Sequence, residues 1–328
     1  MIRIFLGNQL LVLFLLPLVI GGYIMLNSGM LSSETIFFEI SQEVDLGLWG
    51  SFTLGNPSKS GFNWLQFIPG VFVFLNALLL NFLFNINTFY DKNTYVVSLL
   101  YTVLMSFYHS FYQIDGVLIA HSFLILSLFQ LFELENNLDG RKIAFNTGFL
   151  FGCAASFHPP LIFGFPMIWF MLTRIRPFVF RETFLSTIGF ITPLIYGFMM
   201  ILWNKNQINW NFIETSVNYT QKQFLFLISM ALFAFSALLS LWGIRIKNAK
   251  SSIRFRKLTA IIFLLLFIGV GLGTVEILFL KQYEWFSFGM IALVLFLPFS
   301  FFYKATQMFA TILFYTTFLF SIAKFFIK

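Results

Sequence analysis

Apolar segments alternate with short polar stretches along the whole chain of 328 residues. About eleven such segments are present, most of them close to the roughly 20 residues that a helix needs to cross a hydrocarbon core. Helices must do the crossing, because unpaired backbone groups are costly in lipid and the alternation of barrel strands is absent. The pattern predicts helices over 5–26, 64–85, 95–112, 116–133, 143–157, 159–173, 183–203, 223–244, 258–279, 285–303 and 306–325.

Composition agrees with this pattern. Phenylalanine supplies 50 residues and only 10% of the chain is charged, far from the composition of soluble domains. The sequence therefore predicts an all-α, polytopic transmembrane bundle of about eleven spans. The first segment follows Arg3 and has no A-x-A-like cleavage site behind it, so we interpret it as a retained span. Cys153, the single cysteine, excludes an intramolecular disulfide and a cysteine metal cluster.

The basic residues are unevenly divided between alternate loops. With the N-terminus inside, the inner loops carry 14 of the 20 Lys and Arg residues against 5 acidic ones, and the outer side carries 6 basic and 8 acidic ones. This asymmetry follows the positive-inside rule and predicts a bacterial inner-membrane protein with a cytoplasmic N-terminus. Because the net charge of +7 sits in these short loops, we expect no nucleic-acid partner.

Two outer loops, 27–63 and 204–222, are longer than a turn requires. In the first, "SSETIFFEISQEVDLGLWGSF" has apolar positions on one face and acidic positions on another, which predicts a helix after a cap at Ser32 or Ser33. Such a helix is expected to lie in the membrane interface with its acidic face toward water. The alternative is a lipid-facing strut.

His158, Pro159 and Pro160 separate the two shortest predicted helices. Two adjacent prolines remove two hydrogen-bond donors and disfavour helical geometry at the residue before them, so the chain is expected to turn back here. This helical hairpin accounts for the prolines and leaves the histidine without an explanation.

Small residues predict two sites of close helix packing. Gly148 and Gly152, followed by Ala154 and Ala155, give the segment 143–157 a face that another helix can approach closely. "GVGLGT" at 269–274 is a second face of this kind, and it does not match a phosphate-binding loop.

Ionisable residues gather at the outer ends of the predicted spans, where they are costly and usually face the protein interior or a water-filled cavity. Carboxylates beside imidazoles suit general-base activation of a hydroxyl, or a divalent cation holding a lipid-linked phosphate. The alternatives are interhelical hydrogen bonding for two of the histidines, His109 and His121, and capping of a helix for Asp115. The candidate residues are His109, His121, His158, Asp115, Glu34, Glu39, Glu43, Asp45 and Glu276.

Two stretches resemble an uncharacterised multi-span family of Bacteroidota. They are "LNALLLNFLFNINTFYDKNTYVVSLLYTVLMSFYHSF" at 75–111 and "FNTGFLFGCAASFHPPLIFGFPMIWFMLTRIRPFVFRETFLSTIGFITPLIYGF" at 145–198. That resemblance covers about the first 200 residues and implies no activity.

A more distant resemblance is to the GT-C superfamily of integral-membrane glycosyltransferases, which take sugars from polyprenyl-phosphate carriers. "ETIFFEISQEVDLGLWGSF" is similar to their first outer loop, with Glu34 at the catalytic acid, and "YQIDGVLIAHSFLILSLFQLF" is similar to a later acidic turn, with Asp115. "GFLFGCAASFHPPLIFGFP" is similar to their short helical hairpin, with His158 near the customary lysine. Glu34 is followed by Thr35, whereas members of the superfamily often have two adjacent acids at this point. The resemblance therefore leaves open whether a divalent cation is bound.

This resemblance implies a GT-C-like module over 1–205 and a variable membrane module over 206–328. It implies transfer of a sugar from a polyprenyl-phosphate donor at the outer face, with Glu34 and Asp115 as catalytic residues. His109, His121, His158, Glu39 and Asp45 are the expected substrate-binding or phosphate-binding residues. The alternative function is a non-catalytic membrane subunit of a cell-envelope assembly that binds lipid or partner helices.

Overall fold

The computed structural model describes residues 2–7, 11–28, 43–53, 67–135, 139–204, 219–249, 251–280 and 283–326. These residues form helices and one short hairpin. In chain order the elements are α1 (Ile2–Leu6), α2 (Leu11–Asn27), β1 (Glu43–Asp45), η1 (Gly47–Trp49), β2 (Ser51–Thr53), α3 (Ile68–Ile86), α4 (Val96–Met105), η3 (His109–Phe111), α5 (Gly116–Glu133), α6 (Arg141–Phe157), η4 (Pro159–Gly164), α7 (Phe165–Ile175), α8 (Phe180–Asn204), α9 (Tyr219–Asn248), α10 (Ile253–Leu280), η5 (Glu284–Phe286), α11 (Ser287–Phe296), α12 (Pro298–Phe302) and α13 (Lys304–Ala323).

The predicted all-α class is confirmed, and each predicted apolar segment contains a helix. Among the described residues, 7 helical stretches are long and apolar enough to cross a membrane. They are Ile68–Ile86, Gly116–Glu133, Phe180–Trp203, Leu227–Asn248, Ile253–Leu280, Glu284–Phe302 and Lys304–Ala323. Val12–Asn27, Val96–Met105 and Pro159–Ile175 are apolar but shorter. The chain is a multi-pass membrane protein by these criteria, and a count of about eleven spans stays a prediction.

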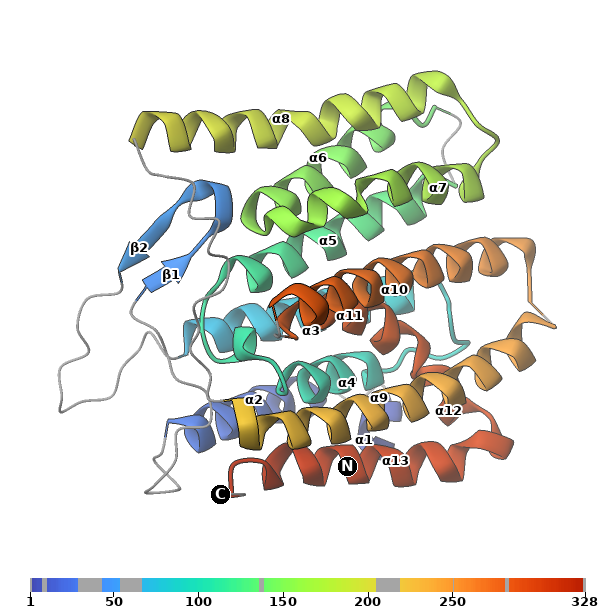
Figure 1. Ribbon diagram of the computed structural model, residues 1–328. Coiled ribbons are helices and arrows are strands. Elements are labelled where there is room, and N and C mark those ends of the chain that lie inside the picture. Colours follow the sequence, from blue (N-terminus) through green and yellow to red (C-terminus); the bar gives the residue numbers. More distant parts are fainter. Residues whose placement is uncertain are drawn as a thin grey trace.

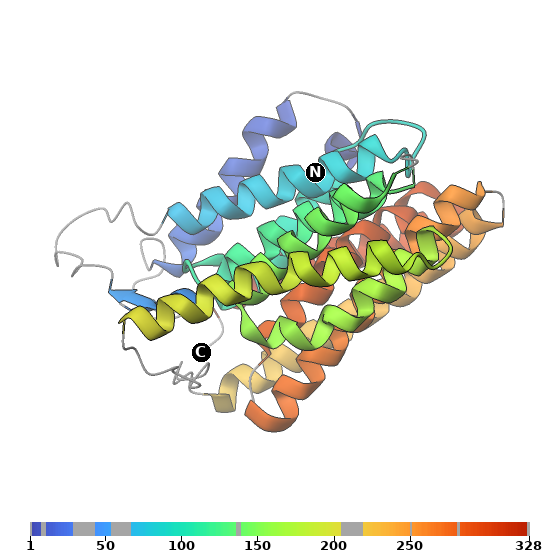
Figure 2. The same cartoon turned by 90° about the horizontal axis from the view of Figure 1, so that it is seen from above.

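Consecutive long helices run back and forth along a common direction and form one bundle (Figure 1). Seen from above, the bundle is elongated along the helices, with the β1–β2 hairpin at one end (Figure 2). The turns α4–α5 and α6–η4 lie at the hairpin end, and the turns α3–α4, α7–α8 and α9–α10 lie at the opposite end (Figure 1). The two ends therefore carry alternate connections of the chain.

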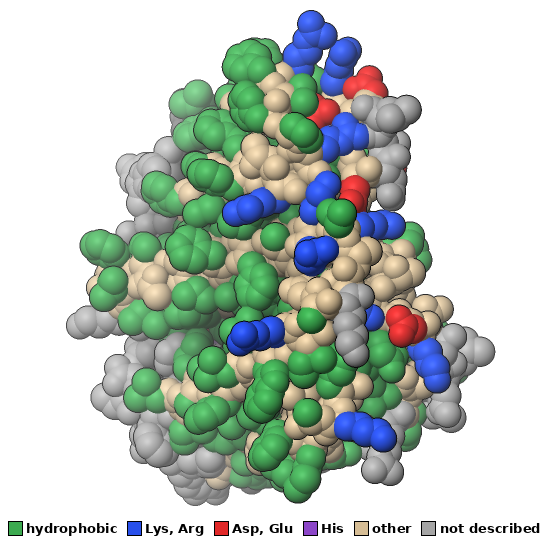
Figure 3. Space-filling model, turned by 90° about the vertical axis from the view of Figure 1, so that its right-hand side faces the viewer, with side chains coloured by type: hydrophobic (Ala, Val, Ile, Leu, Met, Phe, Trp, Pro, Cys, Tyr) green, Lys and Arg blue, Asp and Glu red, His purple; other side chains and the backbone are tan. Residues whose placement is uncertain are grey.

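Lys and Arg side chains gather on the end opposite the hairpin (Figure 3). The four ion pairs found among the described residues join segments of this end: Arg176–Glu182 at 3.2 Å, Arg254–Glu135 at 3.3 Å, Lys247–Asp91 at 3.5 Å and Arg141–Asp139 at 3.7 Å. The bundle thus keeps the inner-loop basic residues apart from the acidic hairpin end, as the charge pattern predicts. We call the two ends the basic end and the hairpin end.

The predicted small face of α6 is the contact with α8. A Cβ atom on Gly148 would clash with the Ser186 carbonyl, and one on Gly152 would clash with the Phe190 carbonyl. Gly189 of α8 is equally close to the Phe145 carbonyl of α6. Because backbones meet directly at three positions, glycine is required on both helices, and the expected close approach is confirmed.

The second small-residue face, in α10, is also confirmed. Gly269 meets the backbone of Gly289 in α11, and a Cβ atom on Gly273 would lie 2.5 Å from Phe286 Cγ. Gly271, between them in sequence, has no other atom within 4 Å of such a Cβ. The packing face therefore follows helical spacing, with Gly271 pointing away.

The prediction of one long helix in the first outer loop is wrong for its described part. Residues 43–53 form the antiparallel hairpin β1–β2 with η1 between the strands, and Val44 pairs with Phe52. Gly47 and Gly50 adopt φ values of +64° and +90°, which a right-handed helix does not accommodate. Glu34 and Glu39 lie outside the described residues.

The turn predicted at the two prolines is confirmed. α6 ends at Phe157, His158 has φ −135° and ψ 88°, and η4 begins at Pro159. A proline has no N–H to donate, so the helix of α6 cannot continue through this point. The turn places His158 at the hairpin end of the bundle.

Candidate functional site

One short segment, Glu284–Phe288 at the start of α11, contacts all three histidine-bearing parts of the hairpin end. Glu284 Oε1 accepts a hydrogen bond from the His109 backbone N–H at 2.8 Å, and Ser287 Oγ lies 3.1 Å from His121 Nε2. The Phe288 ring is 5.1 Å from the His158 ring between centroids. We call this segment the EWFSF segment. It gathers side chains from η3, α5 and the α6–η4 turn into one place.

Glu284 is the acidic centre of this arrangement. Its Oε2 also accepts a hydrogen bond from Ser110 Oγ at 3.2 Å. Its own backbone N–H donates to Glu276 Oε1 at 3.0 Å, and the Trp285 N–H donates to Glu276 Oε2 at 2.7 Å. Glu276 is fully buried, so its carboxylate fixes the connection between α10 and η5.

Asp115 is the N-cap of α5. Its backbone is extended, and its Oδ1 accepts a hydrogen bond from the Leu118 N–H at 2.8 Å. Burial raises the pKa of the Asp115 carboxyl to about 6, with a further rise from the Glu284 charge, against the lowering effects of the cap bond and of His109. The expected alternative of a capping role is thus observed. Near neutral pH the ionised form predominates, and it can accept a proton.

His121 is held on both ring nitrogens. Nδ1 lies 3.1 Å from the Tyr101 hydroxyl of α4, and Nε2 lies 3.1 Å from Ser287 Oγ of α11. The side chain is fully buried. It therefore joins α4, α5 and α11 by hydrogen bonds across helices, which is the structural alternative expected for this residue.

His158 differs from His121 in one respect. Its ring lies 5.4 Å from the Trp285 ring and 5.1 Å from the Phe288 ring, and its Nε2 is buried without a hydrogen-bond partner among the described residues. Burial lowers the pKa of the His158 imidazole to about 3, so it is neutral near pH 7. A buried polar atom without a partner is rare and costly, so Nε2 is one atom here that a bound molecule would satisfy, and the Tyr108 hydroxyl is another.

The β1–β2 hairpin lies against the His158 turn. Trp49 Nε1 donates a hydrogen bond to Ser156 Oγ at 2.9 Å, and the Trp49 ring stacks on Phe157 at 5.8 Å. A Cβ atom on Gly47 would lie 2.5 Å from the Phe157 carbonyl oxygen, and one on Gly116 would clash with the same oxygen. The described part of the first outer loop is thereby docked against the residues next to Asp115 and His158.

Asp45, the described acidic residue of that loop predicted to bind substrate, is exposed and its Oδ1 accepts the Gly47 N–H at 2.8 Å. It stands on the hairpin beside Gly116, where a Cβ atom would lie 3.4 Å from the Asp45 carbonyl oxygen. Within the described part of the chain, no group of three His, Cys, Asp or Glu side chains is arranged to hold a metal ion.

The hairpin end holds a further buried charge that sequence reasoning missed. Lys324, just after α13, is 2% exposed, and its ammonium donates hydrogen bonds to the Ser106 carbonyl and, at 3.4 Å, to the Tyr112 hydroxyl. The rings of Phe107 and Phe325 each lie 4.8 Å from Nζ. Burial lowers the pKa of Lys324 well below its usual value, and the Glu284 charge opposes this shift. The lysine holds the segment that leads from α4 to Asp115.

Sequence reasoning also missed Glu284, although its position in the chain marks it as a candidate. It is an ionisable residue directly before the apolar stretch 285–303, and such residues usually face the protein interior. The structure thus brings His109, Asp115 and Glu284 together, places the His121 and His158 rings 4.9 Å and 5.1 Å from the Phe288 ring, and keeps Asp45 on the hairpin.

No family model, no curated protein and no solved structure matches the chain. The proposed function therefore rests on the chain's own residues.

Proposed function

We propose that this multi-pass membrane protein has a GT-C-like arrangement and transfers a sugar from a polyprenyl-phosphate donor to an acceptor at the hairpin end. The observation that carries the proposal is the EWFSF segment, which contacts His109 and His158 and whose Glu284 charge acts on Asp115, next to the β1–β2 hairpin. Such a gathering of ionisable groups at the edge of an apolar bundle is costly and is typical of a functional site.

In this proposal, a carboxylate takes the proton of the acceptor hydroxyl while that oxygen forms a bond to the sugar C1. The bond between C1 and the phosphate oxygen breaks, and polyprenyl phosphate leaves with the electron pair. Asp115 is ionised near neutral pH and half-buried, which suits a base or a group that orients one. Glu34 is the second catalytic carboxylate of the proposal, and His158 Nε2 is the hydrogen-bonding group directed at the donor.

His109 and His121 have supporting places in this proposal, since the His109 backbone binds Glu284 and the His121 ring bridges three helices. Glu39 and Asp45, both in the first outer loop by sequence, bind substrate or phosphate in this proposal. We further propose that the hairpin end faces the outside of a bacterial inner membrane, because positively charged loops are retained in the cytoplasm.

The test is a cell-envelope glycan that depends on this chain. Asp115→Ala and Glu34→Ala are each expected to lower its formation by roughly 100-fold or more, the size of a lost general base. Asp139→Ala, an exposed acidic residue at the basic end, is the matched control and should leave the glycan unchanged. Unchanged glycan in both active-site variants would contradict an enzymatic function.

A second function is favoured by a specific observation. Glu276, Glu284 and Asp115 all accept backbone N–H groups, and such bonds stabilise the hairpin end without any substrate. The same arrangement suits a non-catalytic subunit of an envelope assembly. A partner retained in equal amount through purification in detergent, together with unchanged glycans in the variants, would favour this second function.

A further inference from the structure

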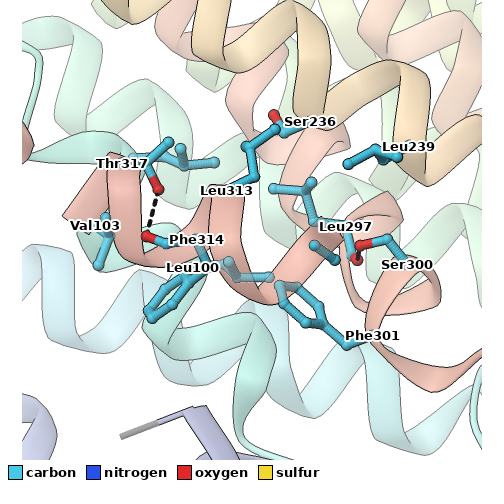
Figure 4. Close-up of a pocket in the computed structure, with 12 residues that line it drawn as sticks. Leu100, Val103, Ser236, Leu239, Leu297, Ser300, Phe301, Leu313, Phe314 and Thr317 are labelled. Carbon is cyan, nitrogen blue, oxygen red and sulfur yellow. Dashed lines mark hydrogen bonds between the residues drawn. The ribbon is translucent and has the colours of Figure 1, made fainter. Parts of the chain in front are cut away.

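A pocket lies inside the bundle and is lined by residues other than those of the candidate site. Figure 4 shows its wall, which is formed by α4, α9, the α11–α12 junction and α13. Side chains from all four converge on it, among them Leu100, Val103, Ser236, Leu297, Leu313 and Thr317. The hollow is small: about 380 Å³ of space lies between its atoms when the open space outside its mouth is included.

The lining offers hydrocarbon and almost nothing else. Its three hydroxyl groups, on Ser236, Ser300 and Thr317, each donate a hydrogen bond to the carbonyl three residues earlier in their own chain segment, at 2.7 to 2.8 Å. Their donors are therefore occupied, and no charged side chain lines the pocket. A ligand here is held by packing alone.

The pocket follows from how the surrounding helices are joined. Pro298 separates α11 from α12 and cannot donate a backbone hydrogen bond to α11. α9 is in close contact with α12 at Gly243, where a Cβ atom would lie 2.7 Å from the Phe299 carbonyl oxygen. Ser236 lies two turns earlier in α9, where the small side chains of Ser236, Ser300 and Thr317 leave the space between the helices unfilled.

The mouth of the pocket opens toward the part of the surface that a bilayer covers. Leu239 and Leu313 are its half-buried lining residues, and the exposed side chains beside them, Phe235, Leu238 and Ile312, are apolar. α9 and α13 are also the two least buried of the seven candidate spans, at 33% and 28%. At this depth the neighbour of the mouth is lipid hydrocarbon.

We infer that this pocket takes the end of a hydrocarbon chain from a bilayer lipid. Chemistry and position agree: the described residues of the wall offer no free group for a polar head, and the lining residues that reach the surface have exposed apolar side chains beside them. The inference goes beyond the proposed function, because none of the residues assigned to the proposed sugar transfer lines the pocket.

Photolabelling of the full chain tests the inference. All ten residues of α4 are buried in the bundle, so a lipid that stays outside the bundle does not label them. The probe is a phosphatidylcholine with a diazirine at the end of one acyl chain, in vesicles of phosphatidylethanolamine and phosphatidylglycerol. We expect label on Leu100 or Val103, which a lipid reaches only through the pocket. A probe with the diazirine on the head group should leave α4 unlabelled.

Two neighbouring threonines supply matched variants. Thr317 lines the pocket and Thr316 is exposed, and each hydroxyl donates to the carbonyl three residues earlier at 2.8 Å. Thr317→Phe should reduce the α4 label by about tenfold, whereas Thr316→Phe should not change it. Label confined to the exposed faces of α9 and α13 in the wild-type chain would overturn the inference, whether or not Thr317→Phe folds.

Discussion

His158 and His121 face the same phenylalanine ring but have opposite hydrogen-bonding states. Their rings lie 5.1 Å and 4.9 Å from Phe288, yet both nitrogens of His121 are bonded, while His158 Nε2 has no partner in the part of the chain that the structure describes. A buried donor or acceptor left unsatisfied costs about 1–3 kcal/mol. The two histidines therefore differ in what they contribute to the free energy of unfolding.

Replacing each histidine by phenylalanine tests this difference. His158→Phe removes an unpaired polar atom, so we expect an unchanged or higher thermal midpoint in detergent together with loss of the proposed transfer. His121→Phe deprives the Tyr101 and Ser287 hydroxyls of their partner and should destabilise the protein by about 1–3 kcal/mol. Equal destabilisation by both substitutions would show that His158 is a structural residue.

Asp115 makes stability depend on pH. Its pKa in the folded protein is raised to about 6 from a usual value of 3.8, so its contribution is fully present below that usual value. The contribution is lost as pH rises through about 6, because the folded protein then holds a charge it disfavours. Asp115→Asn keeps an N-cap side chain and does not titrate.

We therefore expect the thermal midpoint of Asp115→Asn to rise relative to wild type between about pH 4 and about pH 7. Measuring both proteins across this range in one detergent and buffer system separates Asp115 from other titrating groups. If the thermal midpoints of the two proteins change in parallel with pH, burial and the Glu284 charge do not raise the pKa of the Asp115 carboxyl.

The histidines and Asp115 could be selected from the sequence because each is an isolated ionisable residue at the end of an apolar segment. Their partners could not be identified. Glu284 lies 175 positions from His109 and Lys324 lies 218 from Ser106, and such contacts depend on which helices become neighbours. Periodicity along one helix carries no information on that choice.

At the scale of elements, the hairpin shows where periodicity fails. Residues 32–52 have helical spacing, but Gly47 and Gly50 adopt positive φ, and Gly47 lies against the Phe157 carbonyl. The tertiary contact with the α6–η4 turn, through Trp49 and Ser156, outweighs the local preference. The small faces were predicted correctly because close backbone approach depends mainly on the absence of side chains.

Docking of the hairpin should depend on Gly47 more than on Trp49. Gly47→Ala combines a disfavoured φ with a Cβ 2.5 Å from a backbone oxygen, whereas Trp49→Phe keeps an aromatic ring and loses one hydrogen bond of about 1 kcal/mol. We expect hydrogen exchange over 43–53 to rise strongly in Gly47→Ala and slightly in Trp49→Phe. Ser51→Ala, at an exposed position, serves as the control.

The contact of α6 with α8 offers a sharper comparison. Gly148→Leu forces a side chain into the Ser186 backbone, so we expect separation of the helices and a loss of about 1–3 kcal/mol or more. Gly271→Leu makes the same chemical change where nothing lies within 4 Å. Thermal midpoints and the monodisperse fraction in detergent should fall for the first variant only, and similar losses in both would argue against the packing described.

At the scale of the whole molecule, the bundle separates charge. The inner-loop basic residues, such as exposed Lys142 and Arg181, fall at one end, and Asp45, Asp115 and Glu284 fall at the other (Figures 1 and 3). The sequence predicted this division from loop parity, since each crossing reverses the side on which the next loop lies. It follows that the candidate site and the basic end should be reached from opposite sides of a membrane.

Cysteine accessibility tests this central claim most directly. Cys153 is the single cysteine, so Cys153→Ala gives a background for Ser51→Cys on the hairpin and Lys142→Cys at the basic end, both at exposed positions. In intact cells an impermeant maleimide should label Ser51→Cys, and it should label Lys142→Cys only after permeabilisation. Labelling of both positions from the same side would contradict the proposed separation of the two ends.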